Sequence, residues 1–245
     1  IAVLEGVAQN IIKNNEDQDT TPSAVHIGRN NQVHVGQRAK NAVLRKPSDA
    51  YAEFKRRMGT EYLYHFKSSN QRKKPEELSA EVLKALRADV SRRLGEEINA
   101  AVVTVPAAFE LHQCDATKKA AELAGLQVCA LLQEPVAAAL AYGFQADAEK
   151  AYWLVYDFGG GTFDAALIKA QDGLINVVHH GGNNFLGGSD IDWAILEKVI
   201  IPTISKEFDL PDFSRANARW ENEIRMLKHA VEKAKVELTV KEQTT

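Results

Sequence analysis

The chain has few cysteines and no long apolar run, and each absence narrows the class of protein. The two cysteines among its 245 residues, Cys114 and Cys129, fit no CxxC or zinc spacing. They predict free thiols in a reducing cytoplasm rather than a disulfide framework. No apolar run reaches the roughly 18 residues that span a bilayer, and no secretory signal is recognisable. We therefore expect a cytoplasmic protein with no membrane partner.

The chain also has no excess of positively charged residues. The chain carries 30 Lys and Arg against 33 Asp and Glu, a net charge of −3. Nucleic-acid-binding domains are usually basic, so we expect no nucleic-acid partner. The basic cluster "QRKK" at 71–74 is interpreted as a solvated loop. With 45% hydrophobic residues, the composition indicates a globular protein with one large or two modest cores.

Helix and strand patterns alternate along the chain. Leucines and valines recur every four residues from Leu78 to Leu94 and predict a helix that ends at Gly95. The alternation predicts an α/β fold with largely buried sheets. Strands are expected at 98–106, 127–132, 151–156, 163–170 and 174–180, and further helices at 116–125, from Pro135, at 191–208 and at 215–238. Residues 22–75 are more polar, and the polar stretch 145–150 is a candidate hinge.

The sequence "DFGGGTFD", Asp157–Asp164, places three glycines between two carboxylates. Glycines allow close backbone approach and positive φ, and successive amides form an anion-binding nest. There is no GxxxxGK[ST] motif. The dinucleotide fingerprint also fails, because Asp164 replaces its third glycine and a strand pattern follows instead of a helix. The motif therefore predicts a hairpin tip that binds phosphate.

The two carboxylates suggest a metal ion. Asp157 would repel a phosphate unless a divalent cation lay between them, and Mg²⁺ prefers one or two carboxylates with phosphates and waters. Thr162 offers a hydroxyl to a phosphate or a metal-bound water. The alternative is a tight hairpin with solvated aspartates, but three adjacent glycines exceed what such a turn requires.

Several motifs resemble one family in the same order along the chain. They are similar to the ATPase domain of 70-kDa heat-shock chaperones of the DnaK type, which has a two-lobed, actin-like (ribonuclease H-like) α/β fold. The motifs are "TTPSAV", "VGQRAK", "FKRRMG", "VVTVPAAF", "EPVAAALAYG", "DFGGGTFD", "FLGGSDID" and "VEKAKVELT". The short segment between Met58 and Leu78 resembles the compact HscC-type branch. The resemblance implies a first lobe at 1–147, with a variable subdomain at about 22–75. It implies a second lobe at 148–245, with a second subdomain from about 188.

The resemblance also implies site residues. Lys55 matches a lysine that reaches the transferred phosphate, although alone it would be interpreted as surface charge. Glu134 and Asp157 match carboxylates that hold magnesium, mostly through water. Thr162 and Asp164 match further catalytic positions. Nucleotide-binding roles are implied for Gly159, Gly160, Gly161, Gly187 and Gly188, and for Glu232, Lys235 and Thr239, which would share one helix face at the adenosine pocket. Helix N-terminal amides after Gly187 would favour anions.

The implied function is hydrolysis of ATP to ADP with Mg²⁺ in a cleft between the lobes. Hydrolysis would control the binding of unfolded client proteins by a separate domain, with a J-domain cochaperone and a nucleotide-exchange factor as partners. The family's first phosphate hairpin and the end of its second lobe have no match here, so we expect an incomplete fold and weak ATP binding by this chain alone. Cys114 replaces a family arginine that links the domains. The alternatives are a nucleotide-binding scaffold with little turnover and a small-molecule kinase of the same superfamily.

Overall fold

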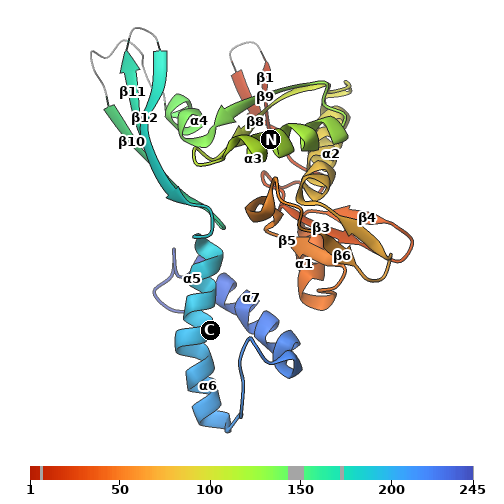
Figure 1. The fold of residues 1–245 in the computed structure, drawn as a ribbon, viewed down its shortest axis with the longest axis vertical. Coiled ribbons are helices and arrows are strands. Elements are labelled where there is room, and N and C mark those ends of the chain that lie inside the picture. The colour runs from red at the N-terminus through yellow and green to blue at the C-terminus, as the bar shows by residue number, and fades with distance from the viewer. Residues whose placement is uncertain (6–7, 143–151, 172–173, 245) are drawn as a thin grey trace. The chain divides into compact units, whose positions relative to one another are not determined.

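The computed structural model describes residues 1–5, 8–142, 152–171 and 174–244 as a mixed α/β structure (Figure 1). It divides into two compact units. The first unit is Ile1–Val155 with Ala165–Gly181, and the second is Tyr156–Asp164 with Gly182–Thr245. The candidate hinge at 145–150 lies outside the described residues. No helix in the described ranges is long and apolar enough to cross a membrane.

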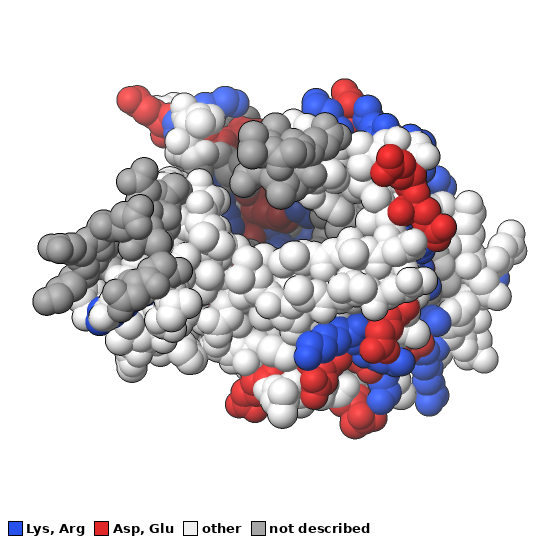
Figure 2. Space-filling model, turned by 90° about the horizontal axis from the view of Figure 1, so that it is seen from above, with Lys and Arg blue, Asp and Glu red and all other residues white. Residues whose placement is uncertain are grey.

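Charged side chains of opposite sign lie close together on the surface. On the face shown in Figure 2, most Lys and Arg side chains lie beside Asp and Glu side chains. The charged regions visible on this face are therefore mostly of mixed sign.

The first unit holds four small sheets and the helices that pack on them. The sheets have the orders β1-β2, β4-β3-β5, β6-β7 and β8-β9, and only the last of these pairs is parallel among those with an assigned register. The elements are β1 (Ala2–Glu5), β2 (Ala8–Ile11), β3 (Ala24–Ile27), β4 (Val33–Val35), α1 (Gln37–Arg45), β5 (Ala50–Ala52), the 3₁₀ helix η1 (Phe54–Arg57), β6 (Tyr64–Phe66), β7 (Gln71–Lys73), α2 (Pro75–Leu94), β8 (Ala100–Val105), α3 (Leu111–Leu123), β9 (Val128–Gln133) and α4 (Glu134–Ala141).

A fifth sheet has the order β10-β11-β12, and its residues are divided between the two units. The strands are β10 (Tyr152–Phe158), β11 (Phe163–Gln171) and β12 (Leu174–Asn183). The second unit adds α5 (Gly188–Ile195), the π-helical segment η2 (Leu196–Ile200), α6 (Ile201–Phe208), the 3₁₀ helix η3 (Ala218–Trp220) and α7 (Glu221–Glu237).

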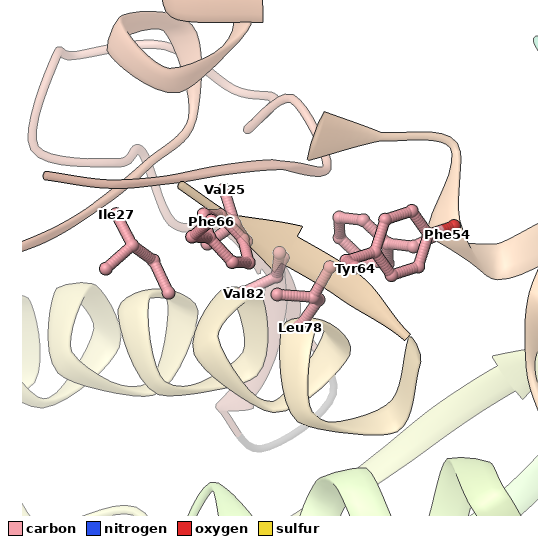
Figure 3. Packing of buried hydrophobic residues seen from close by; sticks show 7 residues of the cluster. All are labelled: Val25, Ile27, Phe54, Tyr64, Phe66, Leu78 and Val82. Atoms are coloured by element: carbon pink, nitrogen blue, oxygen red, sulfur yellow. The ribbon is translucent and has the colours of Figure 1, made fainter. Parts of the chain in front are cut away.

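The main core of the first unit lies between β3, β6 and α2 (Figure 3). Phe66 and Leu78 are fully buried, and Phe54 is 3% exposed. The full set is Val25, Ile27, Phe54, Tyr64, Phe66, Leu78 and Val82. Burial of a large apolar side chain stabilises a fold by roughly 1.5–3 kcal/mol. Because Phe54 belongs to η1, this core also fixes the short helix that carries Lys55.

Helix α2 confirms the helix predicted from the four-residue spacing. Pro75 occupies its first turn, and Glu77 accepts a hydrogen bond from the Lys74 N–H at 2.7 Å. Gly95 ends the helix with φ +71°, a left-handed conformation in which glycine carries no Cβ penalty.

Strands β8 and β9 are less buried than expected. Side chains along a strand alternate between its two faces. Val102 and Val128 are 65% and 64% exposed, whereas Val105 is 4% exposed. One face of this parallel pair therefore has no cover from the described residues, and the expectation of largely buried sheets does not hold here.

The second unit has its own core around Leu196, which is fully buried. Phe213, Ile224 and Val231 pack with it. The helix predicted at 191–208 is divided into α5, η2 and α6. The N–H of Ile201 bonds the carbonyl of Leu196, five residues earlier, in the π pattern. Pro202 follows directly and has no N–H to continue the α-helical ladder.

Candidate functional site

Lys55 and Glu134 meet in the first unit, although 79 residues separate them. Lys55 lies in η1, and Glu134 is the first residue of α4, directly after β9. The Nζ of Lys55 donates to Oε1 of Glu134 at 2.7 Å, which is a charge-assisted hydrogen bond. The lysine side chain is 44% exposed and the glutamate 19%. Both charged groups therefore reach solvent and could contact a ligand.

The start of α3 supports the Lys55 segment. The ring of Phe109 lies with its centroid 5.8 Å from the Lys55 Nζ. Gly59 has φ +73°, and a Cβ at this position would lie 2.6 Å from Cδ2 of His112 and 2.8 Å from its carbonyl oxygen. Only glycine fits this close approach without displacement of α3.

The predicted glycine turn joins β10 to β11. The Gly159 N–H donates to the Thr162 carbonyl at 2.9 Å. None of the three glycines has a positive φ, so conformational freedom is not what the turn requires of them. A Cβ on Gly187 would lie 2.5 Å from the Gly161 nitrogen and 2.6 Å from the Gly160 carbonyl carbon. Close backbone packing is therefore the physical constraint at this contact.

The N-terminus of α5 is bonded to the same turn. The N–H groups of Gly188 and Ser189 donate to the carbonyls of Gly159 and Gly160 at 2.9 and 2.8 Å. The Gly187 N–H donates to Oδ2 of Asp190 at 2.8 Å. The first amides of α5, which the resemblance assigned to an anion, bind turn carbonyls and a carboxylate in this structure. The turn and the start of α5 therefore form one hydrogen-bonded piece.

Helix α7 is attached to this piece through Lys235. Its Nζ lies 2.6 Å from Oδ1 of Asp192 on α5 and donates to the Gly188 carbonyl at 2.8 Å. Asp192 is 1% exposed, and the Nζ of Lys228 lies 3.6 Å from its other oxygen. Lys235 was predicted as a site residue, whereas Asp192 was not. The available signal was an aspartate four residues after Gly188 in "FLGGSDID", one helical turn along α5.

The other predicted residues lie on or near these elements. Asp157 is half-buried on β10, and Asp164 is 2% exposed on β11. Glu232 lies on α7, with an oxygen 3.8 Å from Nδ1 of His229. Thr239 lies in the turn after α7, and its hydroxyl donates to the Val236 carbonyl at 2.7 Å. Thr239 therefore lies beyond the end of α7, whereas the resemblance implied that it shares a helix face with Glu232 and Lys235.

The described residues contain no cluster of the kind that holds a transition metal. Across the described ranges, no group of three or more His, Cys, Asp or Glu side chains gathers as a metal site. Mg²⁺ does not require such a group, because one or two carboxylates with phosphate oxygens and waters complete its shell. The resemblance assigns magnesium to two such carboxylates, Glu134 in the first unit and Asp157 in the second.

A comparison with protein-family models identifies the family of the chain. The model described as Hsp70 protein matches residues 1–245. This match covers every motif named above, from the segment that carries Lys55 to the helix that carries Lys235. The chain therefore belongs to the Hsp70 family and has its actin-like ATPase fold.

Proposed function

We propose that this chain binds and hydrolyses ATP with Mg²⁺ as the ATPase domain of a heat-shock chaperone of the compact HscC-type branch. Membership of the Hsp70 family supports a chaperone ATPase domain. The observation that carries the catalytic part of the proposal is the 2.7 Å pair between Lys55 and Glu134. The resemblance gives Lys55 a role at the transferred phosphate and Glu134 a role in placing the magnesium shell and the attacking water.

Lys55 is proposed to stabilise charge on the transferred phosphoryl group. Phosphoryl transfer depends mainly on positioning and electrostatic stabilisation. An ammonium that donates to a carboxylate oxygen at 2.7 Å can donate in the same way to a phosphate oxygen. The buried neighbour Phe54 holds its backbone, while the exposed side chain remains free to reach a ligand.

Glu134 and Asp157 are proposed to orient magnesium-bound water and the attacking water. The metal ion would neutralise charge on the phosphate oxygens. Thr162 would offer its hydroxyl to a phosphate or to a metal-bound water, and Asp164 would serve as a further carboxylate. Gly160 is exposed at the tip of the turn, where a Cβ would meet no atom within 4 Å. This open tip, with Gly159 and Gly161, suits close approach of phosphate.

Glu232, Lys235 and Thr239 are proposed to form part of the adenosine site, together with the loop at Gly187 and Gly188. The ammonium of Lys235 already binds Asp192 and Gly188. Lys235 would then hold α7 and the loop at Gly187 and Gly188 in place. Its alkyl chain would remain available to pack against the ligand.

Hydrolysis is proposed to switch a separate domain between weak and tight binding of unfolded client proteins in the cytoplasm. A J-domain cochaperone and a nucleotide-exchange factor would act on this cycle. Such control requires that each nucleotide state favours one conformation of the whole protein.

Single-turnover experiments on the full-length protein test the proposal. We expect [γ-³²P]ATP to be converted to ADP and free phosphate only when Mg²⁺ is present, without any added acceptor. Transfer of phosphate to an added hexose would instead indicate a small-molecule kinase. Tight nucleotide binding without phosphate release over hours would indicate a scaffold.

A further inference from the structure

A second candidate site lies in the first unit, at the end of β3 where β5 begins. A cavity of about 450 Å³ opens there. Its walls come from the loop after β3, the segment before β5 and Ser68 in the turn after β6. Its lining residues are His26, Gly28, Arg29, Lys46, Asp49 and Ser68. None of them has a role in the nucleotide chemistry proposed above.

His26 lines this cavity and carries a buried polar atom without a partner. Its side chain is 9% exposed, and its Nε2 is buried with no hydrogen-bond partner in the described structure. A Cβ built on Gly28 would lie 3.8 Å from Cε1 of His26, the atom bonded to Nε2. That edge of the ring therefore lies next to the cavity lining. Buried polar atoms are normally paired, so a ligand in the cavity would satisfy an unmet hydrogen bond.

The charges around the cavity favour an anion. Arg29 and Lys46 are cations, and Asp49 is the single acidic side chain in the lining. Both oxygens of Asp49 already accept hydrogen bonds, from the Ser68 N–H at 2.6 Å and from the Ser68 hydroxyl at 2.7 Å. A metal cation would need free carboxylate oxygens, whereas an anion needs the two cations and the nitrogen of His26.

We propose that this cavity binds a small oxyanion of the phosphate class, either free or as the monoester of a small molecule. Arg29 and Lys46 would supply charge-assisted hydrogen bonds, and His26 would donate from Nε2. Gly28 has no side chain that would cover the ring edge of His26. The cavity is larger than one oxyanion, which leaves room for the organic part of a monoester.

The groups that face His26 make the site sensitive to pH. Burial and then Lys46 lower the pKa of His26, Asp49 opposes them, and Arg38 on α1 lowers it further. His34 stacks on His26 from β4 at 5.6 Å between ring centroids. A bound anion would offset the two cations and raise the pKa of His26. By linkage, sulfate, which stays dianionic, should bind about three- to tenfold more tightly at pH 5.5 than at pH 7.5.

The test is an NMR titration of the histidine side chains in the full-length protein, saturated with MgADP so that the nucleotide site is occupied. The probes are inorganic phosphate, sulfate and glycerol phosphate, with sodium chloride at matched ionic strength as the control. The His26 resonance is assigned by its loss in His26→Gln. We expect it to shift saturably with the three oxyanions but not with chloride. Tighter binding of glycerol phosphate than of phosphate would identify a monoester as the preferred form, and equal binding would identify the free anion.

Matched variants distinguish specific oxyanion binding in the cavity from a general effect of ionic strength. Arg29→Ala and Lys46→Ala should each weaken phosphate binding about tenfold, the loss of one charge-assisted hydrogen bond. Lys84→Ala, at a lysine paired with Glu81 outside both sites, should leave it unchanged, and Asp49→Asn should strengthen it. A backbone spectrum of each variant shows whether the fold is kept. A linear shift that chloride reproduces, or unchanged affinity in folded Arg29→Ala and Lys46→Ala, would overturn the proposal.

Discussion

Asp192 on α5 and Lys235 on α7 form a 2.6 Å ion pair in which the aspartate is almost completely buried. The same lysine donates to the Gly188 carbonyl at 2.8 Å, and the Gly188 N–H donates to Gly159 at the glycine turn. One buried carboxylate therefore links α7, the start of α5 and the proposed phosphate-binding turn.

Replacement of Asp192 by asparagine should destabilise the second unit. The change keeps the shape of the side chain but leaves Lys235 and Lys228 without their anion. Removal of one partner of a buried ion pair costs about 3–5 kcal/mol. Because Lys235 is 30% exposed and can be partly rehydrated, we expect a loss of about 3 kcal/mol in the free energy of unfolding, measured by urea denaturation.

Glu221→Gln is the matched control for this variant. Glu221 pairs with Arg225 one turn along α7, and more than half of the glutamate side chain is exposed. Loss of an exposed pair of this kind costs about 0.5 kcal/mol or less. Equal losses in the two variants would show that Asp192 does not act as a buried link.

Gly59→Ala should be more destabilising than Gly95→Ala, although both glycines have nearly the same positive φ, +73° and +71°. An alanine at such a φ costs about 1–2 kcal/mol. A Cβ at Gly95 would meet no atom within 4 Å, whereas one at Gly59 would overlap His112. We expect about 1 kcal/mol for Gly95→Ala and about 3 kcal/mol for Gly59→Ala, from thermal or urea unfolding. Similar losses would mean that α3 moves freely away from the Lys55 segment.

Stability of the first unit should fall as the pH drops below 6.5. Burial lowers the pKa of His26 and of His34 below the usual 6.5, so the unfolded state takes up protons at a higher pH than the folded state. By linkage, the free energy of unfolding decreases as pH falls through this range. We expect His34→Gln to flatten the pH dependence of urea midpoints between pH 7.5 and 5. His65→Gln, at an exposed position, is the control and should leave the pH dependence unchanged. An unchanged pH dependence in His34→Gln would contradict the proposed role of His34 in the loss of stability.

A separate loss of stability should appear in more acidic solution. Burial alone would raise the pKa of Asp49, but hydrogen bonds from Ser68 and Ser48 hold the pKa below its usual 3.8. A depressed carboxyl pKa contributes stability above pH 3.8 that is lost as the pH falls through the folded-state pKa. Ser68→Ala should reduce the stability difference between pH 5 and pH 3. A variant with the same difference as the parent would show that these hydrogen bonds do not set the pKa.

Local patterns in the sequence predicted some elements well. Helix α2 could be predicted from its four-residue apolar spacing and from Gly95 at its end. Both signals depend on residues that are close together in the sequence. The helix predicted at 191–208 is confirmed, and the π segment Leu196–Ile200 within it was not predicted. The spacing of apolar residues does not predict that the Ile201 N–H bonds the carbonyl five residues earlier instead of four.

The candidate site was harder to predict because its contacts are long-range. The sequence singled out Lys55 and Glu134 only through a family resemblance, since no local pattern relates residues 79 positions apart. The glycine turn was found from its own residues. Its attachment to Gly187 and Gly188 was not, because it depends on backbone packing between separate elements. Asp192 was missed for the same reason, as its burial becomes visible only when α5 and α7 pack together.

Lys55 is proposed to act on the transferred phosphate. The most direct measurement is the single-turnover rate of ATP hydrolysis by Lys55→Ala in the full-length protein, beside its ATP dissociation constant. Lys84→Ala, which removes an exposed lysine paired with Glu81 at 2.9 Å, is the control. We predict a rate about 100-fold or more below the parent for Lys55→Ala, with affinity within about threefold, because the charge is needed in the transition state. A Lys55→Ala rate within about threefold of the parent, like that of Lys84→Ala, would contradict the assignment.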